Sequence, residues 1–341
     1  MWQGSSQKFR APPVRGGRHP FEPLGLLNAS GRSGNRPRWR RRCACRRYRL
    51  SDRSRPEVFI AEPVGSCTDL MATVTYPLRR LYGEDFTVAP VSVLVDPIRA
   101  LRVFGLEQGG SFSEKVLYIY LKQLEEADLI VISKCDLLDG ARLESLRAAI
   151  AARFPHKEIL AVSARKGTGL EAWFDRIARE EQGGGRAMEV DYAVYADGEA
   201  LLGWLNCTAQ LKTPKVLDGD RFLRELASEM QTRLRAEGAE VAHLKMTLSP
   251  DPSIGRIGVV NLVRYDFVPE LSMELGEPMM GGQLIINLRA EAAPAFLGRV
   301  VRQSLEAAAS GFTKLEATLD HLEHFRPGKP TPTHRLTEVA A

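Results

Sequence analysis

Short apolar runs alternate with helical patterns along residues 57–182. The runs are rich in Val, Ile and Leu, which is typical of strands buried on both faces of a parallel sheet. Between them, apolar residues recur every three or four positions and predict helices. We expect strands at 58–61, 91–95, 129–132 and 159–162, and helices at 69–82, 113–126, 141–153 and 170–178. This alternation predicts an α/β domain whose parallel sheet is covered on both faces.

The pattern changes after a glycine-rich stretch at 183–188, which we interpret as a linker. Longer alternating runs and two amphipathic helices then predict a smaller α+β domain over 189–326. We expect one long strand or a hairpin at 192–211, helices at 221–237 and 295–308, and strands at 241–248, 257–265 and 283–289. The Pro- and Thr-rich residues 327–341 are expected to be disordered.

Residues 1–55 have no helical or strand periodicity and hold fifteen Lys and Arg against two acidic residues. We interpret them as a solvated disordered segment, a basic tail that binds RNA or membrane, or a replacement of a structured segment through a misplaced start or a reading-frame error. With a net charge of +5 for the whole chain, the remaining residues are acidic, at −8. A folded surface for nucleic acid is therefore unlikely, because such a surface needs clustered positive charge.

The five cysteines form a sparse, odd-numbered set, which fits a reducing compartment better than a disulfide framework. The sequence contains no apolar run of 18 residues and no signal-peptide pattern at its start. We therefore expect a cytoplasmic protein that does not span a membrane.

The strand at 129–132 ends in Ser133-Lys134-Cys135-Asp136. Ligands of parallel sheets bind beyond the carboxyl ends of the strands, so these polar residues occupy a binding position. A carboxylate there can accept two hydrogen bonds from the N1 and N2 edge of guanine, which adenine does not offer. In that interpretation Lys134 lays its stem along the purine or braces the loop. In the alternative, Asp136 only caps the following helix.

Two other strand ends carry polar signatures, Glu62-Pro-Val-Gly65 and Ser163-Ala164-Arg-Lys-Gly-Thr-Gly. In a nucleotide site, Glu62 would hold Mg²⁺ through water or orient the attacking water, and the Gly65 N–H would contact the γ-phosphate. The backbone amides of the loop at Ser163 and Ala164 would meet the guanine O6. Each signature is weak alone, but their order and spacing together fit a guanine nucleotide.

These motifs, in the combination IAEPVGSCTDL, ISKCDLL and SARKGTGL, resemble the CobW/HypB/UreG group of P-loop GTPases over residues 57–180. The resemblance implies a P-loop NTPase-like domain over 56–182 that hydrolyses GTP with Mg²⁺ to drive metal insertion or metallochaperone work. It also implies a metalloprotein client, and Zn or another transition metal as cargo. A homodimer is a further expectation for the second domain.

The sequence departs from that family at the phosphate-binding loop, because Gly-x-x-x-x-Gly-Lys-[Ser/Thr] occurs nowhere in it. The loop should precede Glu62, where the Arg-rich segment stands. We interpret this as a missing or mistranslated N-terminal part of the domain, and the alternative is a real loss of GTPase activity.

Candidate metal ligands are few. Cys43-x-Cys45 lies where the family carries Cys-x-Cys-Cys, but its surroundings are strongly basic, which disfavours a dication. The pair His321-x-x-His324 would share one face of a helix, or lie on an exposed polar helix without a metal. Cys67 and Cys135 are interpreted as small packing residues.

Two functions follow from these observations. The first is a GTPase of the CobW/HypB/UreG type whose second domain contacts a metalloprotein client. The second is a non-enzymatic interaction protein on a degenerate nucleotide-binding fold, with the basic N-terminal tail contacting nucleic acid.

Overall fold

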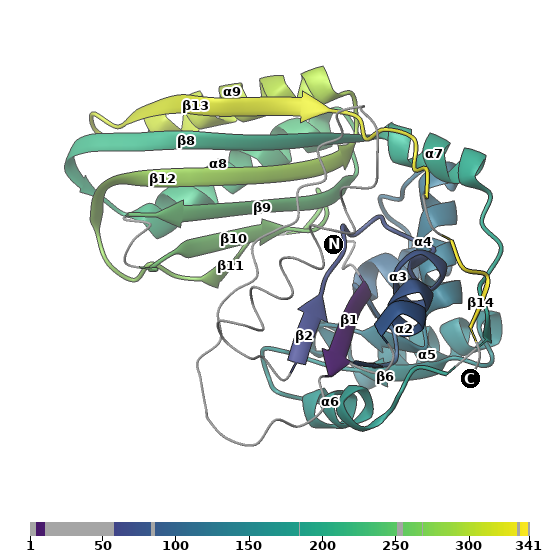
Figure 1. Cartoon of the computed structure of the whole chain (residues 1–341). Coiled ribbons are helices and arrows are strands. Elements are labelled where there is room, and N and C mark those ends of the chain that lie inside the picture. Colours follow the sequence, from purple (N-terminus) through teal and green to yellow (C-terminus); the bar gives the residue numbers. More distant parts are fainter. Residues whose placement is uncertain are drawn as a thin grey trace.

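The described residues form two large sheets with separate helical layers, and a small two-stranded sheet (Figure 1). The computed structural model describes residues 5–10, 58–82, 86–183, 185–250, 255–267, 269–332 and 335–339. The predicted α/β domain followed by a smaller α+β domain is confirmed.

The first sheet has the strand order β2-β1-β4-β5-β6, with β3 beside β1. Its strands are β1 Ser5–Arg10, β2 Val58–Ala61, β3 Thr87–Val88, β4 Ser92–Val95, β5 Leu129–Ile132 and β6 Glu158–Ala161. Strands β4, β5 and β6 are parallel, with Val95 opposite Ile132 and Ile132 opposite Ala161. Strand β1 is antiparallel to both β2 and β4, so β2 runs in the same direction as the parallel strands.

Strand β1 differs from the expectation that residues 1–55 contain no strand. Its sequence, SSQKFR, has no apolar alternation, and the strand is defined by backbone pairing with β2, β3 and β4. Pairing with distant strands leaves no signal in so short a polar segment. The remainder of the basic segment, including Cys43 and Cys45, lies outside the described residues.

Helices cover both faces of the central strand β5, as predicted. Residues Ile130 and Ile132 point into one core with α3, α4 and α5, whereas Leu129 and Val131 point into a second core with α6. All four side chains of β5 are buried. The helices of this domain are η1 Met71–Thr75, α2 Tyr76–Tyr82, α3 Pro97–Val103, α4 Glu114–Glu126, η2 Cys135–Leu137, α5 Gly140–Arg153 and α6 Leu170–Arg179.

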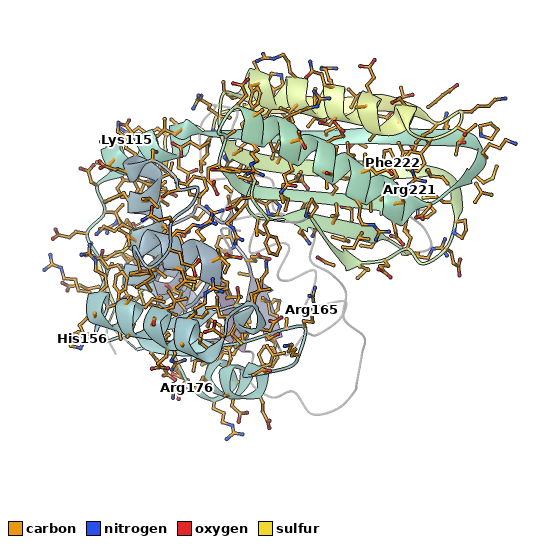
Figure 2. The ribbon with its side chains drawn as sticks, turned by 180° about the vertical axis from the view of Figure 1, so that it is seen from behind. Lys115, His156, Arg165, Arg176, Arg221 and Phe222 are labelled. Carbon is orange, nitrogen blue, oxygen red and sulfur yellow. The ribbon has the colours of Figure 1, made fainter. Side chains whose placement is uncertain are left out.

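The second sheet is antiparallel and has the strand order β11-β10-β9-β12-β8-β13. Its elements are β8 Leu202–Leu217, α8 Gly219–Ala236, β9 Val241–Ser249, β10 Gly258–Leu262, β11 Glu270–Met273, β12 Met279–Glu291, α9 Pro294–Ser310 and β13 Glu316–Phe325. Helices α8 and α9 lie on one face of the sheet (Figure 1). On α8, Phe222 is fully buried against the sheet while its neighbour Arg221 is exposed (Figure 2).

The predicted strand or hairpin over 192–211 is wrong in its first half, because α7 occupies Tyr192–Leu201. The Asp191 side chain caps this helix by accepting hydrogen bonds from the amides of Ala193 and Val194. Helix α7 packs on α4, and Gly198 lies so close to the α4 backbone that a Cβ would stand 2.5 Å from the Lys115 carbonyl oxygen. Tertiary packing therefore overrides the β-branched and aromatic pattern.

The C-terminal residues also differ from the prediction, because residues 335–339 dock on the first domain instead of being disordered. Strand β14 Glu338–Val339 pairs with β7 Gly185–Arg186, inside the stretch interpreted as a linker. The Leu336 amide donates to the Ala72 carbonyl at 2.9 Å. In the part of the chain described, no helix is long and apolar enough to cross a membrane.

Candidate functional site

Polar residues follow the carboxyl ends of four strands that run in one direction. Glu62 follows β2, Asp96 follows β4, Ser133 follows β5, and Ser163 comes two residues after β6. Because these strands share one direction, the four residues lie along the same edge of the sheet. The strand-end positions expected from the sequence are therefore brought to one edge, and Asp96 joins them.

The loop after β5 is fixed by its backbone. Both the amide and the hydroxyl of Ser133 donate to the Val95 carbonyl, each at 2.9 Å. Lys134 is in the left-handed region, with φ +51°, and the following amide, of Cys135, donates to the Val162 carbonyl at 3.0 Å. The loop is thereby tied to both neighbouring strands, and Asp136 stands in its 3₁₀ turn with a half-exposed side chain.

The Asp136 carboxylate lies near the side chain of Ser163 in the neighbouring loop, and this interaction lowers the pKa of Asp136. The side chain is therefore an ionised acceptor at neutral pH, as recognition of the guanine N1–H and N2–H would require. The Lys134 ammonium lies 3.6 Å from Asp96 Oδ2, a contact through which Lys134 would brace the loop. This was one of the two roles that the sequence suggested for it.

The loop after β6 is a tight turn around Ser163, whose side chain is buried. The Ser163 amide donates to the Thr168 carbonyl at 2.9 Å, and its hydroxyl accepts from the Lys166 amide at 3.1 Å. Ala164 is exposed, and Arg165 extends outward from the loop (Figure 2). The turn thus presents its exposed backbone beside the Asp136 carboxylate.

The Glu62 to Gly65 segment lies farther along the edge, because β1 separates β2 from β4. Glu62 is exposed. The Gln123 amide group on α4 donates to the carbonyls of Gly65 and Cys67, both at 2.8 Å. Among the described residues, Glu62 and Gly65 are not joined to the loop at 133–136 by a hydrogen bond or an ion pair, so their predicted roles at a γ-phosphate stay predictions.

The direction of strand β1 determines whether a phosphate-binding loop can follow it at this edge. A phosphate-binding loop follows the carboxyl end of a parallel strand and leads into a helix. The strand between β2 and β4 is antiparallel, so its carboxyl end at Arg10 lies at the opposite edge of the sheet. In the described part of the chain, the strand between β2 and β4 therefore has no phosphate-binding loop after it at the edge that carries Asp136.

Several buried polar residues of the first domain escaped the sequence interpretation. Glu126, at the end of α4, accepts from the Leu70 amide at 2.7 Å and the Met71 amide at 3.4 Å, and burial raises its pKa to about 8. No periodicity distinguishes a buried polar residue on a helix, so Gln123 and Glu126 gave no signal. Asp96 did give one, because it directly follows an apolar strand.

The candidate metal ligands that the structure describes do not form a cluster. Within the ranges described, no three His, Cys, Asp or Glu side chains gather as a metal would require. The predicted helix carrying His321 and His324 is wrong, because both residues lie on β13, where positions three apart face opposite sides. His324 lies over Gly298 of α9, and His321 is 3.8 Å from Glu323.

The two cysteine thiols near the motifs are held in the protonated form. Burial raises the pKa of Cys67 to about 12, and burial also raises the pKa of Cys135. A protonated thiol is a poor metal ligand, and the role of both cysteines as packing residues stays a prediction.

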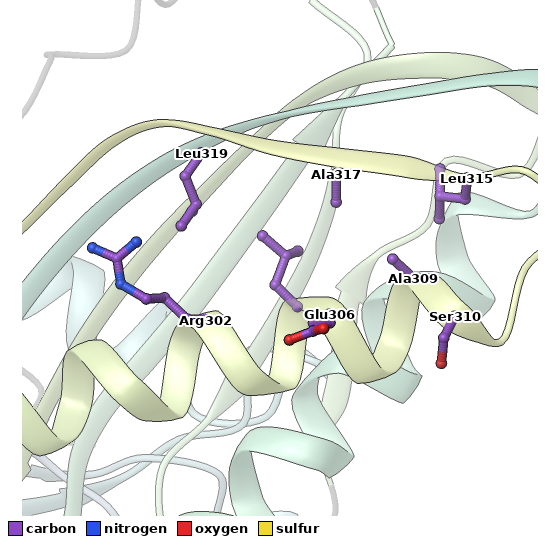
Figure 3. Close-up of a pocket in the computed structure, with 8 residues that line it drawn as sticks. Arg302, Glu306, Ala309, Ser310, Leu315, Ala317 and Leu319 are labelled. Atoms are coloured by element: carbon purple, nitrogen blue, oxygen red, sulfur yellow. The ribbon is translucent and has the colours of Figure 1, made fainter.

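A cavity of about 530 Å³ lies between α9 and β13, lined by apolar residues with Arg302 and Glu306 at its rim (Figure 3). It contains none of the residues predicted from the strand-end motifs.

No family model and no curated protein matches this chain. Among solved structures, it is similar to a Zn(II)-bound triple mutant of the YjiA GTPase, with 14% identity and a TM-score of 0.21 over 65% of this chain. It is also similar to Zn(II)-bound YjiA GTPase from E. coli, with 13% identity and a TM-score of 0.20, over 70% of this chain and 67% of that one. The chain spans 60% of the length of the first structure. Similarity at this level does not assign the chain to a family.

Proposed function

We propose that the edge formed by the loops after β5 and β6 binds the guanine base of a nucleotide. The observation that carries this proposal is the ionised, half-exposed Asp136 carboxylate held beside the Ser163 turn. Two hydrogen bonds from guanine to one carboxylate are charge-assisted, and each contributes about 1.5–3 kcal/mol when the site excludes water. Adenine presents an acceptor at N1 and no amino group at C2, so it would gain neither bond.

Each residue of this edge has a distinct part in the proposal. Asp136 accepts the two hydrogens of the base, and the exposed backbone at Ala164 donates to O6. Ser163 orients Asp136, and Lys134 holds the loop in its left-handed turn. These parts need no phosphate, so the proposal concerns recognition of the base.

The wider activity rests on the resemblance to CobW/HypB/UreG GTPases. Under it, the protein would couple GTP hydrolysis to metal insertion, with Mg²⁺ bound through water to Glu62, Zn as cargo and a metalloprotein client. The sequence contains no Gly-x-x-x-x-Gly-Lys-[Ser/Thr] loop, so we derive no hydrolytic step. We expect this polypeptide to bind Mg·GTP weakly or undetectably, and calorimetric titration showing micromolar affinity would overturn that expectation.

Ligand-observed saturation-transfer NMR tests base recognition without relying on phosphate contacts. Guanosine and adenosine at millimolar concentration are compared on the whole chain and on Asp136→Asn. We expect saturation of guanosine alone, and loss of that signal in the variant. The matched control is Asp175→Asn, an exposed carboxylate on α6 that pairs with Arg179 at 3.2 Å. Equal signals from the two nucleosides would reject the proposal.

A further inference from the structure

One buried carboxylate connects the candidate base-binding loop to the second domain. Asp96 caps α3 and is 1% exposed. Its Oδ1 accepts from the Arg99 amide at 3.1 Å and from Arg264 Nη1 at 2.9 Å. Arg264 follows β10 and is itself 4% exposed, so an ion pair between the two domains is fully desolvated.

The other oxygen of Asp96 faces the loop after β5. Asp96 Oδ2 has no hydrogen-bond partner among the described residues, and the Lys134 ammonium is 3.6 Å away. Lys134 adopts a left-handed backbone conformation that costs a residue with a side chain about 1 kcal/mol. The contact with Asp96 compensates part of that cost, and the conformation turns the chain toward Asp136.

Arg264 also forms an ion pair with a residue of its own domain. Its Nε lies 3.1 Å from Asp266 Oδ1, and Asp266 also pairs with Arg102 of α3 at 2.5 Å. Beside it, Arg99 Nη2 donates to the carbonyls of Val241 and Val263, at 2.9 and 2.6 Å. Any change in the docking of the second domain must therefore move the guanidinium that orients Asp96.

We propose that Asp96 is a positioning residue through which docking of the second domain, by way of Arg264, sets the conformation of the base-binding loop at Lys134. The coupling between domain docking and the Lys134 loop rests on the ion pairs alone. Its effect on base binding rests on the proposed function. Coupling between sites is reciprocal, so a bound base in turn stabilises the domain contact. Removal of Arg264 frees the Asp96 carboxylate to rotate away from Lys134, so the contact that compensates the left-handed conformation weakens and the turn loosens.

Hydrogen exchange tests the coupling without a ligand. The reporters are the amides of Cys135, Leu137 and Leu138, which are bonded within the loop or to Val162. We compare the whole chain with Arg264→Met, with the charge-retaining Arg264→Lys, and with Arg302→Met on the exposed face of α9. Arg264→Met should raise exchange of these amides about tenfold, as a coupling of 1.4 kcal/mol predicts. Arg264→Lys should restore most of the protection, and Arg302→Met should change nothing.

The outcomes separate this inference from the proposed function. The core amides of α8 must stay protected in Arg264→Met, which shows that the second domain is folded. Unchanged exchange at residues 135–138 in that folded variant would overturn the coupling, whether or not guanosine binds. If exchange rises but the unmodified chain does not bind guanosine, the coupling stands and the proposed function fails. If guanosine binds, its affinity should also fall about tenfold in Arg264→Met.

Discussion

Arg335 and Asp69 are 266 residues apart in the sequence and form a two-pronged ion pair, with Nε to Oδ2 at 2.7 Å and Nη2 to Oδ1 at 3.2 Å. Asp69 is 1% exposed, adopts a left-handed conformation at φ +62°, and also accepts from the Tyr192 hydroxyl. It directly precedes the turn into the π-helix η1. The C-terminal residues therefore fasten the segment that follows the Glu62 to Gly65 motif.

Loss of this pair should destabilise the protein, because Asp69 would stay buried with only Tyr192 as a partner. We expect Arg335→Ala to lower the free energy of unfolding by about 2–4 kcal/mol, measured by urea denaturation. Arg186→Ala removes an exposed arginine whose pair with Glu189 spans 3.8 Å, and should change stability by less than about 0.5 kcal/mol. Equal effects of the two substitutions would contradict a structural role for the C-terminal contact.

Arg99 should be the residue that most strongly joins the two domains. It is 3% exposed and donates to two carbonyls of the second domain, besides an ion pair with Glu240 at 3.2 Å. Arg99→Ala removes both of these hydrogen bonds and the positive charge that pairs with buried Glu240, which should cost about 3–5 kcal/mol. We expect a single urea transition to separate into two, whereas exposed Arg153→Ala should retain one. A single transition in both variants would show that the domains are joined by other contacts.

Glu126 should make stability depend on pH. Its folded pKa is raised to about 8 from an unfolded value near 4.5, first of all by burial, so between these values the folded state binds more protons. The free energy of unfolding then falls as the pH rises through this window, by up to about 1.4 kcal/mol per unit. Glu126→Gln should flatten this slope in urea denaturation at pH 6 and pH 8.5.

Glu199 contributes in the same direction, because burial raises its pKa to about 7. The Glu126→Gln variant should therefore keep a shallower slope. The control is Glu125→Gln, whose exposed carboxylate pairs with Lys122 at 2.8 Å and should leave the slope unchanged. If Glu126→Gln keeps the full dependence of the free energy of unfolding on pH, the Glu126 carboxyl group is ionised in the folded protein.

Gly167 and Gly169 lie in the loop after β6, and the same substitution at each can be compared. Both have positive φ, but a Cβ at Gly169 would stand 2.2 Å from the Ala161 carbonyl oxygen, whereas a Cβ at Gly167 meets nothing within 4 Å. Gly167→Ala should cost about 1 kcal/mol of stability from backbone strain. Gly169→Ala should cost at least about 2 kcal/mol, because the backbone itself must move. Thermal unfolding of both variants measures the difference, and equal costs would mean that the turn relaxes freely.

The fold could be predicted where a single element buries an apolar stripe or run. The strand at Leu129–Ile132 and the helix at Glu114–Glu126 follow from periodicity alone. Strand β1 and helix α7 could not be predicted in this way, because distant partners define them. The polar β1 sequence gains its hydrogen bonds from β2 and β4, and α7 is fixed by packing on α4.

The candidate site was also predictable only where a local sequence pattern marks it. The strand ends predicted from the sequence place Asp136 and Ser163 in the loops that follow β5 and β6, and in the structure Ser163 lowers the pKa of Asp136. The links from Asp96 to Arg264 and from Asp69 to Arg335 join segments that are 168 and 266 residues apart. Such contacts depend on tertiary packing and leave no local pattern in the sequence.

The central claim is that Asp136 recognises a guanine base. The most direct measurement is the saturation-transfer signal of guanosine relative to adenosine, recorded on the whole chain, on Asp136→Asn and on Asp175→Asn. The account predicts a guanosine signal that persists in Asp175→Asn and disappears in Asp136→Asn. A guanosine signal that survives in Asp136→Asn, or an equal adenosine signal on the unmodified chain, would contradict it.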